Sequence, residues 1–115
     1  MDNVIEEKSF RFAIRIVNLY KYLCAEKKEY VLSKQLLRCG TSIGANVAEA
    51  QQAQSRPDFI AKLSIALKET TETKYWLRLL NATEYMEKSH FQYLYGDCTE
   101  IEKLLVSILK STKQS

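Results

Sequence analysis

The residues best able to do chemistry in this chain are three cysteines, Cys24, Cys39 and Cys98, and a single histidine, His90. The cysteines lie far apart and lack the Cys-x-x-Cys spacing of many zinc sites and redox centres. Glu87 and His90 have the Glu-x-x-His spacing of di-metal carboxylate bundles, but such a site needs a second histidine. We therefore expect reduced thiols, no catalytic, metal or cofactor site, and a protein that is not an enzyme.

A stripe of basic residues is the second feature that could act on a ligand. Lys8, Arg11 and Arg15 recur at spacings of three and four, so they share one face of a helix. Such a stripe could follow a phosphate backbone, with a tyrosine stacking on a base. The alternative is a solvated helix face. The candidate nucleic-acid-binding residues are Lys8, Arg11, Arg15, Lys21, Tyr22, Lys27 and Lys28.

The net charge permits a nucleic-acid partner without requiring one. The 115 residues include 17 Lys and Arg against 14 Asp and Glu, a net charge of +3. Residues 1–38 hold eight basic and five acidic residues, which accounts for the whole excess, because residues 39–115 hold nine of each. A symmetric assembly would repeat the basic segment and add its charges.

In a third set of residues, charged and polar side chains occur among apolar ones. Asn46 falls on the predicted apolar seam of its helix, where one buried polar residue can fix the register of packing. On the next helix, Glu69 and Glu72 alternate with large apolar residues. If the two helices run antiparallel about Ser55, Arg38 lies opposite Glu72. We therefore predict that Arg38 pairs with Glu72 or Glu69 and that Arg38, Asn46, Glu69 and Glu72 form a structural polar core.

The same register brings Glu49 close to Lys62. The main interpretation of these pairs is that they set register; a functional polar pocket and a solvated face are the alternatives. Truncating one member of a buried pair costs about 3–5 kcal/mol. If the Arg38 pair is buried, Arg38→Ala should therefore lower the melting temperature sharply.

Amphipathic helices are needed to position these residues. Glycine (3) and proline (1) are scarce, which argues against a β-fold with many tight turns. Apolar residues recur at alternating spacings of three and four, as on one face of a helix. Ser55, Pro57 and Asp58 mark a helix start, since serine suits the N-cap and proline the first turn. The predicted helices span residues 9–25, 30–53, 56–81 and 89–110.

Short connections make consecutive helices antiparallel neighbours. The sequence therefore predicts one all-α domain, residues 1–115, folded as an antiparallel up-down four-helix bundle. Two glycines four residues apart, Gly40 and Gly44, favour close approach of a neighbouring helix. The alternative is a helix break at Gly40, with Thr41 or Ser42 capping a new helix.

The first helix has more apolar surface than a lone bundle needs. Phe10 and Val17 belong to one apolar stripe, and Phe12 and Ile16 belong to a second beside it. One stripe is enough for a helix on the edge of a bundle. Two stripes favour burial on two sides of the helix. We expect the second side to be an interface with another copy of the chain, and a wide core face is the alternative.

The sequence also bears on location. No run of ~18 uncharged apolar residues occurs, as a membrane-spanning helix would require. The N-terminal residues lack a basic segment followed by an apolar run, so no secretory signal is expected. We expect a cytoplasmic protein without a membrane partner.

Two segments carry a resemblance to a known family. Residues 36–50, LLRCGTSIGANVAEA, resemble the RR-x-x-x-SI-x-x-NIAEG stretch of the bacterial four helix bundle family. That family is also called the 23S ribosomal RNA intervening-sequence protein, or S23 ribosomal protein, family. Residues 65–77, IALKETTETKYWL, resemble its third-helix motif, and the resemblance spans roughly residues 9–109. Ala50 stands where the family usually has glycine, and Cys39 where it has a second arginine.

The resemblance implies a four-helix bundle assembled as a homo-oligomeric ring, commonly a homopentamer. It also implies relatedness to the accessory protein of diversity-generating retroelements, which works with a reverse transcriptase on nucleic acid. The family name describes a location inside ribosomal RNA genes and establishes no activity.

Two functions are therefore predicted. The first is a non-enzymatic homo-oligomer that binds structured RNA or a nucleoprotein partner, such as a nucleic-acid-processing protein. The alternative is a protein–protein scaffold or adaptor without intrinsic affinity for nucleic acid.

Overall fold

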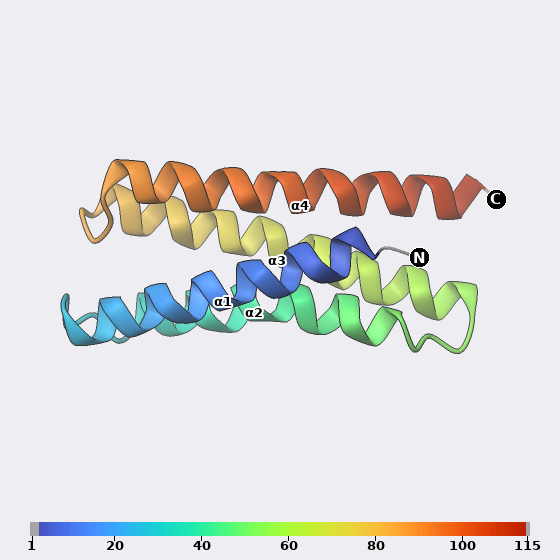
Figure 1. Cartoon of the computed structure of the whole chain (residues 1–115), viewed down its shortest axis with the longest axis horizontal. Coiled ribbons are helices and arrows are strands. Elements are labelled where there is room, and N and C mark those ends of the chain that lie inside the picture. Colours follow the sequence, from blue (N-terminus) through green and yellow to red (C-terminus); the bar gives the residue numbers. More distant parts are fainter. Residues whose placement is uncertain (1–2, 115) are drawn as a thin grey trace.

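The computed structural model describes residues 3–114, which form four α-helices and no strand. In chain order these are α1 (Val4–Ala25), α2 (Leu32–Ala50), α3 (Arg56–Ala82) and α4 (Lys88–Gln114). Consecutive helices run antiparallel (Figure 1), so the predicted all-α four-helix arrangement is confirmed. The predicted ends were less accurate: α1 and α4 are longer than expected, and α2 is shorter at both ends.

Each helix buries the apolar seam that its sequence predicts, with few changes. The six buried residues of α3 follow the predicted alternating spacings of three and four: Leu63, Ala66, Thr70, Thr73, Leu77 and Leu80. On α1, the stripe containing Phe12 and Ile16 is fully buried. The neighbouring stripe lies at the edge of the core, because Phe10 at its start is 66% exposed and Val17 is half-buried.

The expectation for Asn46 needs correction. The buried position on this part of the α2 seam is taken by Val47, whereas Asn46 is only half-buried. A one-residue difference turns a side chain by about 100° around a helix with 3.6 residues per turn. Asn46 therefore lies on the flank of the seam, outside the apolar core.

Close packing of α1 against α2 depends on the two glycines. A Cβ atom added at Gly40 would lie 2.9 Å from two side-chain carbons of Ile16, and one at Gly44 would lie 3.2 Å from the backbone oxygen of Ser9. α2 is continuous through both positions. The prediction of close approach is therefore confirmed, and the alternative of a helix break is wrong.

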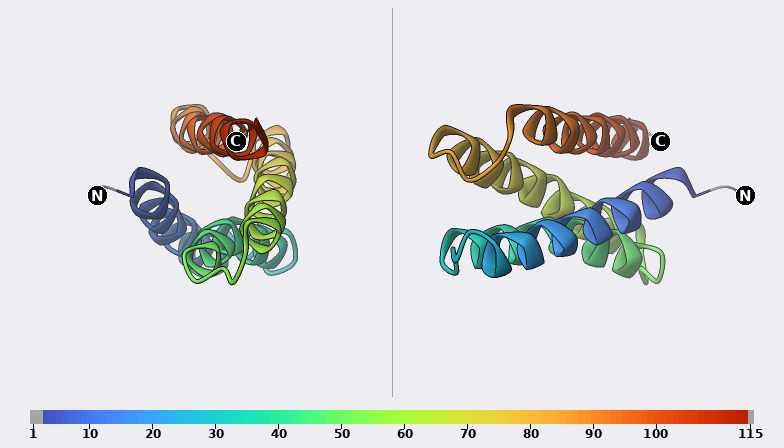
Figure 2. Two further views of the ribbon diagram at one scale, coloured as in Figure 1. Left: turned by 90° about the vertical axis from the view of Figure 1, so that its right-hand side faces the viewer. Right: turned by 60° about the vertical axis from the view of Figure 1, so that its left-hand side comes forward.

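The four helices are arranged as a horseshoe in cross-section, with α1 and α4 at its two ends (Figure 2). Both figures show that α1 is inclined to α4: the helices are closest near the start of α1 and diverge toward its end. The divergence leaves the side of the bundle between α1 and α4 more open than the others. No helix in residues 3–114 is long and apolar enough to cross a membrane.

The starts of α3 and α2 are fixed by two different caps. Ser55 caps α3 as predicted, because its hydroxyl accepts a hydrogen bond of 3.2 Å from the Asp58 N–H. The cap of α2 was not predicted. Glu29 lies between the predicted helices 9–25 and 30–53. Its carboxylate is buried and accepts hydrogen bonds from the N–H groups of Val31, Leu32 and Ser33, at 3.0, 3.0 and 2.7 Å.

The protonation of Glu29 is set by two opposing effects. Burial of the carboxyl group raises its pKa, but the hydrogen bonds from Ser33, Leu32 and Val31 favour the charged form, and the net pKa is lowered. A group with a lowered pKa in the folded state stabilises the fold above its unfolded pKa. That stabilisation disappears as the pH falls through the folded-state pKa.

The glycine contact predicts opposite effects of two alanine substitutions. Gly40→Ala should lower the free energy of unfolding by about 1 kcal/mol or more, because the clash with buried Ile16 outweighs the gain in helix propensity. Gly96→Ala on α4 is the matched control, since nothing lies within 4 Å of its added Cβ, and it should raise the same quantity by about 1 kcal/mol. Urea unfolding measures both. A stabilising Gly40→Ala would contradict the close approach.

The Glu29 cap predicts a pH-dependent stability difference. Glu29→Ala should lower the free energy of unfolding by about 1–2 kcal/mol at pH 7, because three N–H groups lose their acceptor. The difference in free energy of unfolding between the unmodified protein and Glu29→Ala should persist above pH 4.5, the ordinary pKa of a glutamate side chain. It should shrink at lower pH as the native carboxylate is protonated. Unfolding at several pH values measures it; a gap that grows on acidification would contradict the cap.

Candidate functional site

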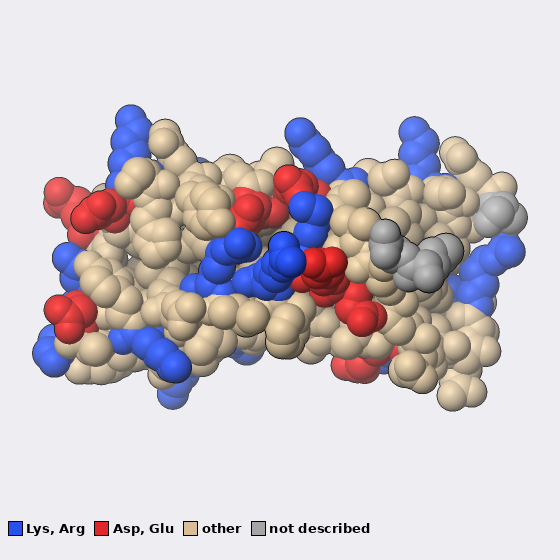
Figure 3. Space-filling model, in the orientation of Figure 1, with Lys and Arg blue, Asp and Glu red and all other residues tan. Residues whose placement is uncertain are grey.

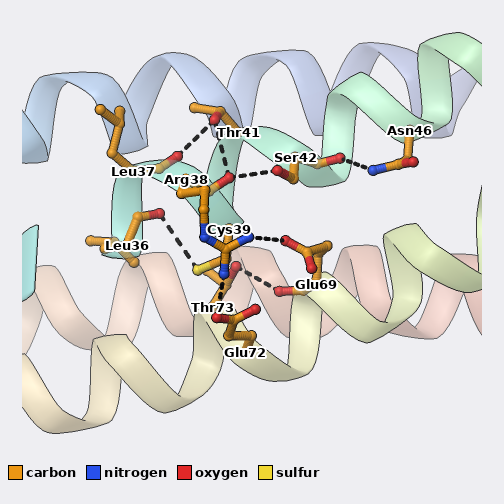
Figure 4. Close-up of polar contacts among 10 residues, drawn as sticks. All are labelled: Leu36, Leu37, Arg38, Cys39, Thr41, Ser42, Asn46, Glu69, Glu72 and Thr73. Carbon is orange, nitrogen blue, oxygen red and sulfur yellow. Dashed lines mark hydrogen bonds and ion pairs between the residues drawn. The ribbon is translucent and has the colours of Figure 1, made fainter. Parts of the chain in front are cut away.

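The predicted ion pair between α2 and α3 is confirmed, but it lies at the surface (Figure 4). One guanidinium nitrogen of Arg38 lies 3.5 Å from Glu69, and another contacts Glu72. The hydrogen bond and charge of Glu72 raise the pKa of Arg38. The Arg38 side chain is 53% exposed, however, whereas Glu69 is 13% exposed. The expectation of a buried pair is therefore wrong: the arginine is exposed, and Glu69 is largely but not fully covered.

Polar side chains near Arg38 bond to their own helix (Figure 4). The Asn46 amide donates to the carbonyl of Ser42 at 2.8 Å, and the Ser42 hydroxyl donates to the carbonyl of Arg38 at 2.6 Å. These local bonds satisfy the side chains without reaching another helix. The four residues of the proposed polar core thus form a surface seam between α2 and α3, in which Asn46 has no direct contact with the ion pair. The predicted neighbours Glu49 and Lys62 do meet, at 3.5 Å.

The two buried cysteines, Cys39 and Cys98, are poorly suited to chemistry. Burial raises the pKa of the Cys39 thiol to about 11 and that of Cys98 to about 12. Both thiols are therefore protonated near neutral pH and are weak nucleophiles. Cys39 and Cys98 donate to backbone carbonyls of Leu36 and Thr70. Within residues 3–114, no cluster of histidine, cysteine and acidic residues is suited to a metal ion.

The basic stripe of α1 faces α4, where acidic residues meet it. Lys8 contacts Glu100, and Arg15 lies 3.1 Å from Asp97. At the middle of the face shown in Figure 3, Lys and Arg atoms accordingly lie directly beside Asp and Glu atoms. These ion pairs bridge α1 and α4 where the helices are close, and they compensate the positive charge of the stripe.

Arg11 is paired too, within α1 itself. It contacts Glu7, one turn earlier on the helix, at 2.6 Å. Three of the seven candidate nucleic-acid-binding residues are therefore engaged with acids. The other cations of that set, Lys21, Lys27 and Lys28, are exposed and make no ion pair with any residue from 3 to 114. They gather around the end of α1 and the connection to α2.

A pocket of about 550 Å³ lies where α1 and α4 diverge. The seventh candidate, Tyr22, lines it together with Arg15, so the structure brings these two residues together. The pocket also contains groups that sequence reasoning did not assign to a site. Its lining residues are Arg15, Asn18, Leu19, Tyr22, Met86, Glu87, His90 and Tyr93.

The residues that α4 contributes to this site were not predicted from the sequence. Tyr93, Asp97 and Glu100 are spaced by four and three, so they share one face of a helix beside the apolar seam. The spacing alone was a usable signal of a polar face. Nothing in the sequence, however, indicated that this face would meet the basic stripe, because that depends on how the last helix packs against the first.

Arg38 provides a test of the α2–α3 seam. Arg38→Ala should lower the free energy of unfolding by about 1 kcal/mol, because exposed ion pairs contribute little. Lys34→Ala, which removes an exposed cation of the same helix without an ion pair among residues 3–114, should leave it unchanged. Denaturant unfolding measures both variants. A loss of about 3 kcal/mol or more would show that the pair behaves as a buried one.

Comparison with known proteins shows to which family the chain belongs. No curated protein matches the chain. A solved structure of a protein of unknown function from the S23 ribosomal protein family of Bacteroides thetaiotaomicron is 61% identical, with a TM-score of 0.91. The match covers 92% of this chain and 98% of that one. The family model described as 23S rRNA-intervening sequence protein matches residues 1–107, and the chain therefore belongs to that family.

Proposed function

We propose that this protein is a non-enzymatic scaffold that assembles with copies of itself through the outer face of α1, defined by Phe10, Ile14 and Val17. The observation that carries the proposal is the exposure of large apolar side chains there. Phe10 is 66% exposed and Ile14 is 48% exposed, and Val17 is half-buried beside them. Contiguous exposed apolar surface is typical of protein–protein interfaces.

The neighbouring surface of α2 supports this proposal. A hollow of about 520 Å³ lies beside Phe10 and is bordered by Gly44 and Ala48. Small residues on α2 leave the Phe10 ring without cover from its own chain. A side chain from a second copy could fill the hollow and remove the ring from water, and burial of a phenylalanine contributes about 1.5–3 kcal/mol.

Family membership and symmetry suggest the form of the assembly. The family resemblance implies a homopentameric ring, which is the assembly that a head-to-tail interface forms when it closes. All three cysteines are free thiols, and two of them, Cys39 and Cys98, are buried, which suits the cytoplasm. A nucleic-acid-processing protein is the partner that the family resemblance favours for such a scaffold.

Binding of structured RNA is the second candidate function. One observation favours it: Lys21, Lys27, Lys28 and Lys34 are exposed and unpaired among residues 3–114, at the end of the bundle that holds the α1–α2 connection. A ring would repeat this group of lysines in every subunit. The phosphate contacts would then come from these residues, and Lys8, Arg11 and Arg15 would stay with their acidic partners.

Self-assembly can be tested by placing a charge on the proposed interface. Ile14→Asp should shift the protein to monomers, because an unpaired carboxylate would be buried between copies. Val106→Asp on α4 is the matched control, since Val106 is also 48% exposed, and it should leave the assembly intact. Sedimentation velocity measures the mass, and circular dichroism checks folding. Equal behaviour of the two folded variants would contradict an interface on α1.

RNA binding can be tested on the unpaired lysines. If structured RNA binds, Lys27→Glu/Lys28→Glu should weaken binding at least about tenfold near 50 mM salt and flatten its salt dependence, because phosphate contacts release counterions. The matched double variant Arg11→Glu/Arg15→Glu should have the smaller effect, since those arginines already have acidic partners. Filter binding at two salt concentrations measures both. No binding at low salt would exclude this second function.

A further inference from the structure

We propose that the pocket between α1 and α4 binds a nucleobase that carries an exocyclic amino group, presented either by a free nucleoside or by an unpaired base of a strand. The lining residues of the pocket lie on and beside α1 and α4 at one end of the bundle. Figures 1 and 2 show that the two helices diverge at this end. It is distinct from the outer face of α1 and from the unpaired lysines of the α1–α2 connection. The proposal depends on neither function proposed above, because a free nucleoside carries no phosphate and can bind a single copy of the chain.

The size and floor of the pocket suit a flat apolar group. Its volume of about 550 Å³ falls within the range of about 300–1,000 Å³ of small-molecule sites. Leu19 and Met86, which are 2% and 8% exposed, contribute buried apolar surface to the lining. A planar ring resting on these side chains would lose contact with water on one side.

Two aromatic side chains line the pocket and remain accessible. Tyr22 on α1 is 42% exposed, and Tyr93 on α4 is 54% exposed. Tyrosine rings on opposite sides of an opening are the stacking surfaces with which proteins hold unpaired bases. Neither tyrosine makes a ring contact with another aromatic side chain within residues 3–114, although the Arg15 guanidinium lies over one face of the Tyr93 ring.

The charges in the pocket argue against a phosphate as the group that enters it. Arg15 lies 3.1 Å from Asp97, and its guanidinium lies 5.3 Å from the centre of the Tyr93 ring. Its charge is therefore compensated and its position is fixed. Glu87 adds a carboxylate without an ion pair among residues 3–114, which would repel a phosphate.

The same carboxylate favours a base with an amino group. A carboxylate accepts hydrogen bonds and can take one from the exocyclic amino group of cytosine, as in base recognition by acidic residues. Asn18 adds an amide that both donates and accepts. The side chains of Asn18, Glu87 and His90 make no hydrogen bond with any residue from 3 to 114, so all three are available to a ligand.

Titration of the full chain with cytidine and uridine tests the proposal, because uridine lacks the exocyclic amino group. Amide NMR shifts report where each nucleoside binds. Tyr93→Ala should weaken cytidine binding about tenfold, given the contribution of base–aromatic stacking. Tyr75→Ala is the matched control: Tyr75 is 53% exposed on α3, away from the pocket, and its loss should have no effect. Thermal melting confirms that both variants are folded.

Two further experiments test whether the base comes from a free nucleoside or from a strand, and whether Glu87 determines the preference for an amino group. Titration with unpaired oligocytidine and oligouridine shows whether the base is taken from a strand. If oligocytidine binds, oligouridine does not, and Tyr93→Ala abolishes the binding, the proposal is supported with a strand as the source. Glu87→Gln should reduce the preference for cytidine over uridine, because a charged acceptor forms the stronger hydrogen bond.

Several results would overturn the proposal. One is the absence of saturable binding by every nucleoside and oligonucleotide at millimolar concentration. Equal binding by the Tyr93 and Tyr75 variants, or equal affinity for cytidine and uridine, would also overturn it. Binding of a tryptophan-containing peptide at this pocket, dependent on Tyr93 and unmatched by any nucleoside, would assign the site to a protein partner instead.

Discussion

The close contact of α1 with α2 is the constraint on which the rest of the structure depends. Gly40 and Gly44 let α1 approach so closely that Ile16 and the backbone of Ser9 occupy the space of a missing side chain. Because α1 is held against α2 in this way, it cannot also pack along the whole of α4. The side of the bundle between α1 and α4 is therefore bridged by the ion pairs of Lys8 and Arg15, and it opens as a pocket beyond Arg15. On the other flank of α1, Phe10 faces solvent beside Gly44 and Ala48.

Local patterns predicted most of the fold. Alternating spacings of three and four located every helix, and Ser55 marked a helix start correctly, since both signals act within a few residues of the chain. The α2–α3 register was also predictable, because a short connection fixes which residues face each other, and Arg38 does meet Glu72. Glu29 was missed because a carboxylate that caps a helix looks, in sequence, like any charged loop residue.

The candidate site was less predictable, for a physical reason. The basic stripe of α1 was identified correctly as a shared face, but its environment depends on α4, some 80 residues away along the chain, as the contact of Arg15 with Asp97 shows. Short-range spacing contains no information on such a contact. Asn46 shows the other weakness: the predicted seam was wrong by one residue, which moved its side chain from the core to the flank.

The central claim is that the exposed face of α1 is covered by other copies of the same chain. Sedimentation equilibrium of the unmodified protein over a wide concentration range tests it most directly. The account predicts a mass that is a fixed multiple of the 13.3 kDa subunit and that falls only on strong dilution. A single species of 13.3 kDa at every concentration would contradict it, because Phe10 and Ile14 would then remain in water throughout.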